Sequence, residues 1–127
     1  MDSDAKIMIK KVIIITGAAG GLGQAIVRTC LSNFPDLIIV ATDITPKVES
    51  MFAGEVIAKV MDVTDEASIH AVRKSLEKND IQVWGMVNNA GVSDFFPVSE
   101  KEKASLEKMF AINTFGAVNM VRPFFPT

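Results

Sequence analysis

The feature that most limits how this chain can fold is a glycine-rich stretch, T-G-A-A-G-G-L-G, at residues 16–23. The apolar, β-branched run V-I-I-I precedes it, and apolar residues at helical spacing follow it, at Leu22, Ile26 and Cys30. Glycines let a backbone approach a ligand closely, and the free N–H groups of a helix N-terminus attract negative charge. Although glycine turns also serve as plain connectors, a strand, a glycine turn and a helix in succession favour a pyrophosphate-binding site.

Composition restricts the class of protein further. The chain has 127 residues, of which 49% are hydrophobic and 22% charged, so it can bury a core and is too apolar to be disordered. A net charge of −2 gives no attraction to nucleic acid or to an anionic membrane. No apolar run approaches the roughly 20 residues of a membrane-spanning helix. With an acidic start, M-D-S-D, and a single cysteine, we expect a cytoplasmic protein with no membrane or nucleic-acid partner and no metal.

Apolar runs of strand length alternate with amphipathic segments along the chain. The runs predict strands at 11–15, 37–42, 55–61 and 82–87, and the amphipathic segments predict helices at 22–33, 64–79 and 99–121. Strands that alternate with helices predict an α/β fold with a parallel sheet and right-handed crossovers. We therefore expect a single Rossmann-type domain over residues 1–127, with strand order 3-2-1-4, which is an incomplete doubly wound fold.

The last predicted helix is apolar on two sides. Ser99 and Glu102 have the spacing of a capping box at its start, and Pro123 and Pro126 are expected to end it. A helix with two apolar faces is usually covered on both, so one face should lie on the sheet and the other against a further surface. The two rows are Leu106, Phe110, Ala117 and Val121, and Met109, Ile112, Gly116 and Met120.

Two carboxylates close predicted strands. Asp43 follows the second strand, where a carboxylate can accept both hydroxyls of an adenosine ribose and repel a 2′-phosphate. The glycine turn carries no Arg or Lys, and Lys47 lies too far along, so the pattern favours NAD, with NADP less favoured. Asp62 closes the third strand and is placed to accept a hydrogen bond from an adenine amino group, beside the Val63 backbone. Capping of the following loop is the alternative for both carboxylates.

Polar residues after the fourth strand and in the last helix complete the candidates. The run N-N-A-G at 88–91 can let a cofactor ribose lie against the backbone, although Asn and Gly are also ordinary turn residues. From the sequence pattern alone, Asn113 is interpreted as a polar residue on the flank of a helix. His70 is expected at the surface, and Cys30 is expected to pack in the core rather than react. The loop 92–97 either approaches a substrate or packs loosely.

These motifs, in this order, resemble the short-chain dehydrogenase/reductase family over about residues 10–126, the N-terminal half of a family member. The resemblance implies hydride transfer between NAD(H) and a carbonyl or alcohol substrate. It implies that Asn113 is the family's catalytic-site asparagine, which kinks its helix and holds a proton-relay water through its backbone carbonyl. It also implies cofactor contacts at the pyrophosphate (Gly17, Gly21, Leu22, Gly23), the adenosine ribose (Asp43, Ile44), the adenine (Asp62, Val63) and the nicotinamide-side ribose (Asn89, Ala90, Gly91).

The family's catalytic serine and Tyr-x-x-x-Lys pair follow a fifth strand, beyond the extent of this sequence, which contains no tyrosine. Without them general acid–base catalysis has no agent, so we expect these 127 residues alone to show no dehydrogenase turnover. We also expect a homo-oligomer, formed through the fourth strand's edge or the last helix. Two hypotheses remain: the N-terminal, cofactor-binding portion of an NAD-dependent oxidoreductase, or a non-enzymatic nucleotide-binding or protein-interaction module.

Overall fold

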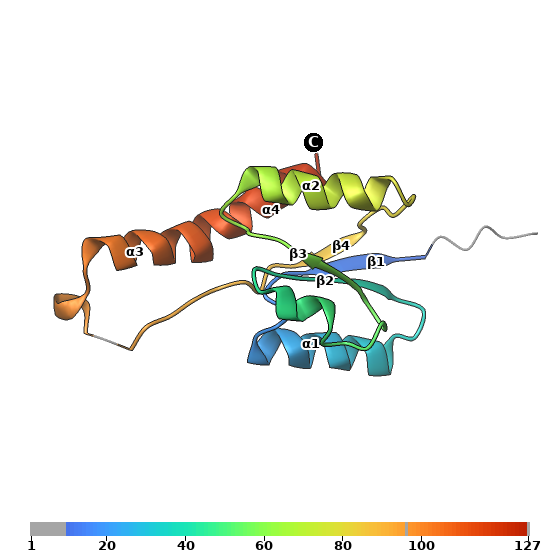
Figure 1. The fold of residues 1–127 in the computed structure, drawn as a ribbon, viewed down its shortest axis with the longest axis horizontal. Coiled ribbons are helices and arrows are strands. Elements are labelled where there is room, and N and C mark those ends of the chain that lie inside the picture. Colours follow the sequence, from blue (N-terminus) through green and yellow to red (C-terminus); the bar gives the residue numbers. More distant parts are fainter. Residues whose placement is uncertain (1–9, 96, 127) are drawn as a thin grey trace, which may run out of the picture.

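The fold is a parallel sheet with helices on both faces (Figure 1). The computed structural model describes residues 10–95 and 97–126. Its four strands pair in the order β3-β2-β1-β4, and every pairing is parallel. This confirms the predicted fold class and strand order. The strands are β1 (Val12–Ile15), β2 (Ile38–Asp43), β3 (Ile57–Val60) and β4 (Gly85–Val87).

The helices divide between the two faces of this sheet. Helix α1 and the short 3₁₀ helix η1 cover one face, and α2 and α4 lie side by side over the other (Figure 1). A long rod formed by α3, the π-helical segment η3 and α4 projects beyond the sheet at its α3 end (Figure 1). The helical elements are α1 (Gly21–Asn33), η1 (Pro46–Glu49), α2 (Glu66–Glu77), η2 (Val98–Glu100), α3 (Lys103–Phe110), η3 (Ala111–Phe115) and α4 (Gly116–Phe124).

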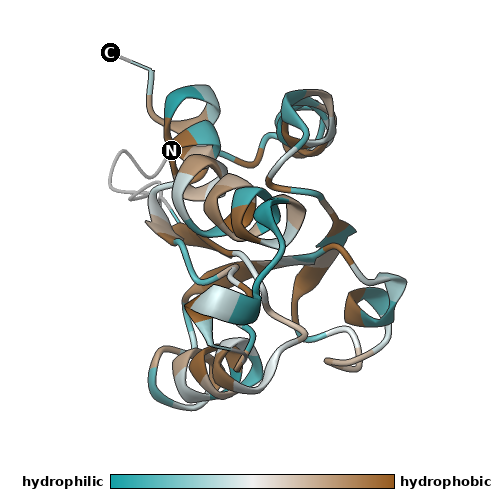
Figure 2. Ribbon diagram, turned by 90° about the vertical axis from the view of Figure 1, so that its left-hand side faces the viewer, coloured by the Kyte–Doolittle hydropathy of each residue, from teal (hydrophilic) through white to brown (hydrophobic). Residues whose placement is uncertain are grey.

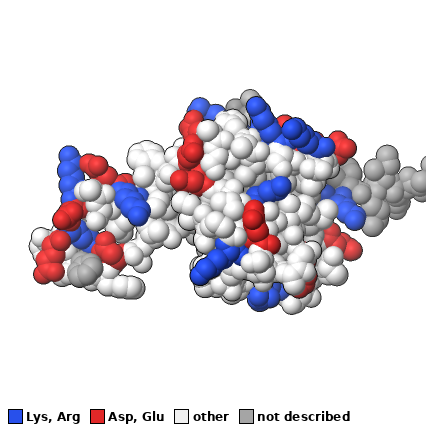
Figure 3. All heavy atoms as spheres, in the orientation of Figure 1, with Lys and Arg blue, Asp and Glu red and all other residues white. Residues whose placement is uncertain are grey.

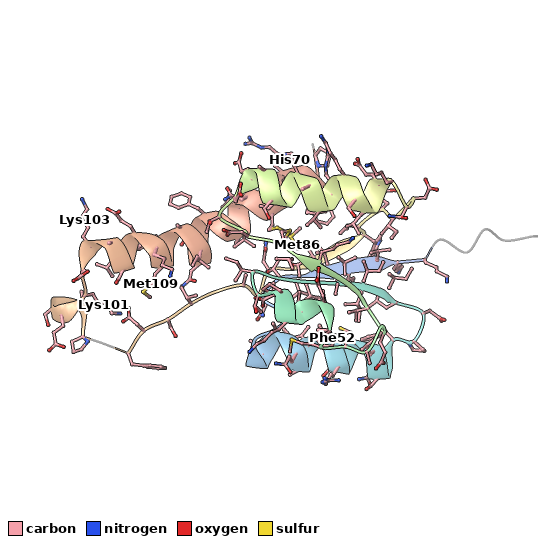
Figure 4. All side chains as sticks on the ribbon, viewed as in Figure 1. Phe52, His70, Met86, Lys101, Lys103 and Met109 are labelled. Atoms are coloured by element: carbon pink, nitrogen blue, oxygen red, sulfur yellow. The ribbon has the colours of Figure 1, made fainter. Side chains whose placement is uncertain are left out.

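Both sheet faces are packed, which explains the unbroken apolar runs of β1 and β2. Successive side chains of a strand point to opposite faces, so Ile14 and Val40 enter the core beneath α2 and α4. Ile15 and Ile39 enter the opposite core, against α1 and Phe52 (Figure 4). Strands and inward helix sides are accordingly brown in Figure 2, the colour of hydrophobic residues. A strand buried on both faces reads as a continuous apolar run rather than an alternating one.

The predicted boundaries of the last helix are wrong at both ends. Ser99 lies in η2 and does not cap α3, because Lys101 adopts an extended conformation and separates the two helical segments. Helix α3 instead begins after Glu102, whose side chain makes no capping hydrogen bond. At the other end, α4 passes through Pro123, and the N–H of Phe125 donates to the Val121 carbonyl at 2.8 Å. Pro123 thus lies inside α4, one residue before its end at Phe124, instead of stopping the helix.

The two apolar rows of the last helix have different surroundings. Met120 is fully buried against the sheet, and Gly116 lies so close to Val63 that a Cβ would be 2.6 Å from its Cγ2 atom. On the other row Phe110 is 61% exposed and Val121 is 47% exposed. One face of this helix therefore packs on the sheet as predicted, and the other is open within the described chain.

His70 lies at the surface as predicted, whereas Cys30 lies at the edge of the core rather than fully inside it. His70 is exposed on the outer side of α2 (Figure 4), and Cys30 is half-buried among the apolar residues beneath α1. Within residues 10–95 and 97–126, no helix is long and apolar enough to cross a membrane. In the same part of the chain, no three His, Cys, Asp or Glu side chains gather closely enough to hold a metal ion.

Candidate nucleotide-binding site

A cavity of about 380 Å³ lies at the carboxyl ends of the strands. Two larger cavities lie at the opposite, amino ends of the strands. The cavity beside Trp84 has a volume of about 810 Å³, and the cavity beside Gln82 has a volume of about 420 Å³. Ligands of open α/β sheets bind outside the carboxyl ends, at the point where the strand order reverses. The smaller cavity is therefore the candidate site. Seven of the residues predicted to contact a cofactor line it: Gly17, Asp43, Ile44, Asp62, Val63, Ala90 and Gly91.

The glycine turn is shaped by two close backbone approaches. Gly17 has a φ of +65°, and a Cβ on it would lie 2.9 Å from the Cα of Ala90. A Cβ on Gly23 would meet the carbonyl oxygen of Gly17 and would lie 2.8 Å from the Cα of Ala18. Apart from its chain neighbours and its own helix backbone, nothing lies within 4 Å of the corresponding position on Gly21, and Leu22 beside it is 69% exposed. The first turn of α1 is thus open at the positions where its N–H groups lack helical partners.

Thr16 joins this turn to the segment after β4. Its side-chain Oγ1 accepts hydrogen bonds from the backbone N–H groups of Asn89 and Ala90, each at 3.0 Å, and the residue is 1% exposed. The side-chain amide of Asn89 donates in return to the carbonyls of Thr16 and Gly17, both at 3.2 Å. Sequence reasoning included Thr16 in the glycine motif but gave it no role. Its partners are more than 70 residues away, so no local pattern indicates them.

Asp43 is held over the glycine turn by two backbone groups. Its Oδ2 atom accepts a hydrogen bond from the N–H of Ala19 at 3.0 Å, and its Oδ1 atom accepts one from the N–H of Thr45 at 3.1 Å. The second bond caps the following turn, as the alternative interpretation predicts. The first bond aims the carboxylate toward the glycine turn, and the residue remains partly exposed. Asp43 therefore combines a capping role with a fixed position in the cavity wall.

Asp62 caps its own loop. Its Oδ1 atom accepts hydrogen bonds from the N–H of Thr64 at 2.9 Å and from the hydroxyl of Thr64 at 2.7 Å. This is the loop-capping alternative, although the Oδ2 atom has no hydrogen-bond partner among the described residues. The neighbouring Val63 is 8% exposed, and its carbonyl accepts a hydrogen bond from the side-chain amide of Asn119. The loop after β3 and helix α4 are thereby held together at the cavity wall.

Asn113 clamps the backbone that follows the N-N-A-G run. Its Oδ1 atom accepts from the N–H of Val92, and its amide donates to the Val92 carbonyl, both at 2.8 Å. Asn113 lies within η3, where the hydrogen-bonding pattern changes from α to π. Single-turn π segments of this kind interrupt the regular hydrogen-bond ladder of a helix. The side chain of Asn113 is thus committed to Val92, a contact that the sequence pattern did not reveal.

The family profile described as short chain dehydrogenase matches residues 11–127. The chain belongs to the short-chain dehydrogenase family. Among similar curated proteins is the uncharacterized oxidoreductase TDA5 of Saccharomyces cerevisiae, 33% identical over 118 residues, a match that covers 91% of this chain. Galactitol 2-dehydrogenase of Agrobacterium fabrum is 34% identical over 114 residues, with 88% of this chain covered.

Two solved structures are similar to this chain in fold. The KRED1-Pglu enzyme superposes with a TM-score of 0.83 at 27% identity. The 3-ketoacyl-(acyl-carrier-protein) reductase of Brucella melitensis, solved with NADH, gives a TM-score of 0.80 at 25% identity, with 91% of this chain covered. These matches span 50% and 49% of the solved chains, and the TDA5 match spans 36% of that protein. The present chain thus spans half or less of the length of these relatives.

Proposed function

We propose that this chain is the cofactor-binding portion of an NAD(H)-dependent oxidoreductase that transfers hydride between the nicotinamide and a carbonyl or alcohol substrate. Membership of the short-chain dehydrogenase family supports the oxidoreductase class. The observation that carries the cofactor choice is Asp43, whose carboxylate is fixed over the glycine turn by the Ala19 N–H at 3.0 Å. When bound, the nicotinamide supplies the hydride chemistry, and the residues described here bind and orient the cofactor.

In this proposal, a dinucleotide lies along the cavity and the adjoining first turn of α1. Open space at Gly21 leaves room for a pyrophosphate at the N-terminus of α1, between Gly17 and Gly23 and beside Leu22. Asp43 and Ile44 would hold the adenosine ribose. The free Oδ2 atom of Asp62 and the Val63 backbone would meet the adenine, and Asn89, Ala90 and Gly91 would form the wall for the second ribose. Asn113 would act through its backbone carbonyl, because its side chain is committed to Val92.

Asp43→Asn is expected to weaken NADH binding about 10- to 150-fold, while weakening NADPH binding less or improving it. The neutral amide loses a charge-assisted contact to the ribose hydroxyls, a loss of about 1.5–3 kcal/mol, and it no longer repels a 2′-phosphate. Calorimetric titration of both nucleotides measures the effect. Glu49→Gln, an equal change of charge at an exposed position on η1, should leave both affinities unchanged. An NADH affinity that is the same in Asp43→Asn and in the wild type would refute this assignment.

We also propose that the chain self-associates through the exposed side of η3 and α4. Phe115, Val118 and Val121 are 61%, 63% and 47% exposed there, and large apolar surfaces of this kind mark interaction sites. Sedimentation velocity at increasing concentration should show a dimer or larger species, and Val118→Asp should shift it toward monomer. A wild-type protein that sediments as a monomer at high concentration would contradict this proposal. The same face is the surface that a non-enzymatic interaction module would use.

A further inference from the structure

Lys108, on α3, lines the cavity that holds Asp43 and Asp62. It is the single cation among the described residues of that cavity wall, which also holds two carboxylates. Sequence reasoning assigned it no role, because it lies on a different element, far along the chain from the glycine turn. Its position on the last turn of α3 brings it beside Ala111 and Ile112, which line the same wall.

The ammonium group of Lys108 has no ion-pair partner within the described chain. On the same helix, by contrast, Lys103 pairs with Glu107 at 3.6 Å, and Lys101, which precedes α3, pairs with Asp94 at 2.9 Å. Charges of both signs are interspersed over this projecting end of the molecule (Figure 3). Lys108 is therefore an uncompensated positive charge, and it faces a cavity that otherwise carries carboxylates. An anion that enters the cavity is the natural partner for it.

We propose that Lys108 is a specificity residue that counteracts Asp43 by favouring a cofactor with a 2′-phosphate. This inference rests on the proposed function. NADH and NADPH differ only in that phosphate, which adds close to two negative charges at neutral pH. A lysine in the cavity wall therefore stabilises NADPH more than NADH, whereas Asp43 does the reverse. The balance of the two side chains makes the preference for NAD(H) smaller than Asp43 alone would give.

The test is a comparison of NADH and NADPH dissociation constants for the wild-type chain, Lys108→Met and Lys103→Met. Lys108→Met should raise the dissociation constant of NADPH by about two- to fivefold, as expected for an exposed charge near a phosphate, and that of NADH by less than about twofold. Lys103→Met is the matched control, because Lys103 lies on the same helix with a side chain that is 90% exposed and paired with Glu107. It should leave the ratio of the two constants unchanged, and Lys108→Arg should retain the wild-type ratio.

Three results would overturn the inference while the proposed function stands. These are an equal loss for both nucleotides in Lys108→Met, an unchanged ratio in that variant, or a wild-type protein that binds NADH and shows no NADPH binding. A wild-type protein that binds neither nucleotide would instead refute the proposed function, and the inference would fail with it. Circular dichroism of each variant confirms that the fold is retained, as expected for exposed positions on α3.

Discussion

Gly23→Ala is expected to lower the free energy of unfolding by about 3 kcal/mol or more, the range of severe overpacking. The new methyl group would meet the Gly17 carbonyl and lie 2.8 Å from the Cα of Ala18, so backbone rather than a flexible side chain would have to move. The movement opens the glycine turn, and NADH binding should be lost together with stability. Urea unfolding followed by far-ultraviolet circular dichroism measures the change.

Gly21→Ala is the control that separates stability from binding. The added methyl group meets nothing within 4 Å outside its chain neighbours and its own helix backbone, and alanine favours a helix over glycine by up to about 1 kcal/mol. This variant should be as stable as the wild type or slightly more so. It should nevertheless bind NADH more weakly, because the methyl group occupies the space that we assign to the pyrophosphate. If Gly23→Ala unfolded at the same midpoint urea concentration as the wild type, the close packing of Gly23 against Gly17 and Ala18 would be contradicted.

Thr16→Val is expected to cost about 1–3 kcal/mol of stability. The substitution keeps the shape of the side chain but removes the oxygen that accepts hydrogen bonds from Asn89 and Ala90. The Asn89 N–H still donates to the Val87 carbonyl at 3.1 Å, so the partly buried N–H of Ala90 is the group that loses its acceptor. Each unsatisfied buried group costs about 1–3 kcal/mol. Because the bonds join the glycine turn to the segment after β4, NADH binding should weaken as well. Equilibrium unfolding and NADH titration of the same preparation give both values.

The control for this variant is Thr29→Val, on the exposed side of α1. Substitutions at such surface positions usually change stability by less than about 0.5 kcal/mol. A Thr16→Val protein with the same unfolding midpoint as Thr29→Val would show that the hydroxyl does not connect the two segments. Normal stability with lost NADH binding would also contradict our interpretation, because the contacts of Thr16 are internal.

The sequence predicted the strand order and the position of the cavity because both depend on short-range patterns. Unbroken apolar runs such as V-I-I-I identify strands buried on two faces, and the glycine turn identifies the first connection. Asp43 could be placed at the cavity because it closes the second strand, and the position of that strand in the sheet was itself predicted. The candidate residues at strand ends followed from the same reasoning, since carboxyl ends of parallel strands share one edge.

The remaining features depend on contacts that no local pattern contains. The capping-box prediction at Ser99 failed because an extended residue, Lys101, separates η2 from α3. The hydrogen bonds of Thr16 and the clamp between Asn113 and Val92 join segments that only the fold brings together. Lys108 enters the cavity wall because of the direction in which α3 projects from the sheet, and a sequence pattern specifies that direction poorly.

The most direct test of the central claim is to map NADH onto the chain by ¹H–¹⁵N correlation spectroscopy of the labelled protein. We expect the largest amide shifts at Gly17, Gly21 and Gly23 and at Ala90 and Gly91, with saturation at a single site. These residues line the cavity or form the turn at the carboxyl ends of the strands. An unchanged spectrum at saturating NADH, or shifts confined to the amino-end cavity around Phe34 and Trp84, would contradict the claim.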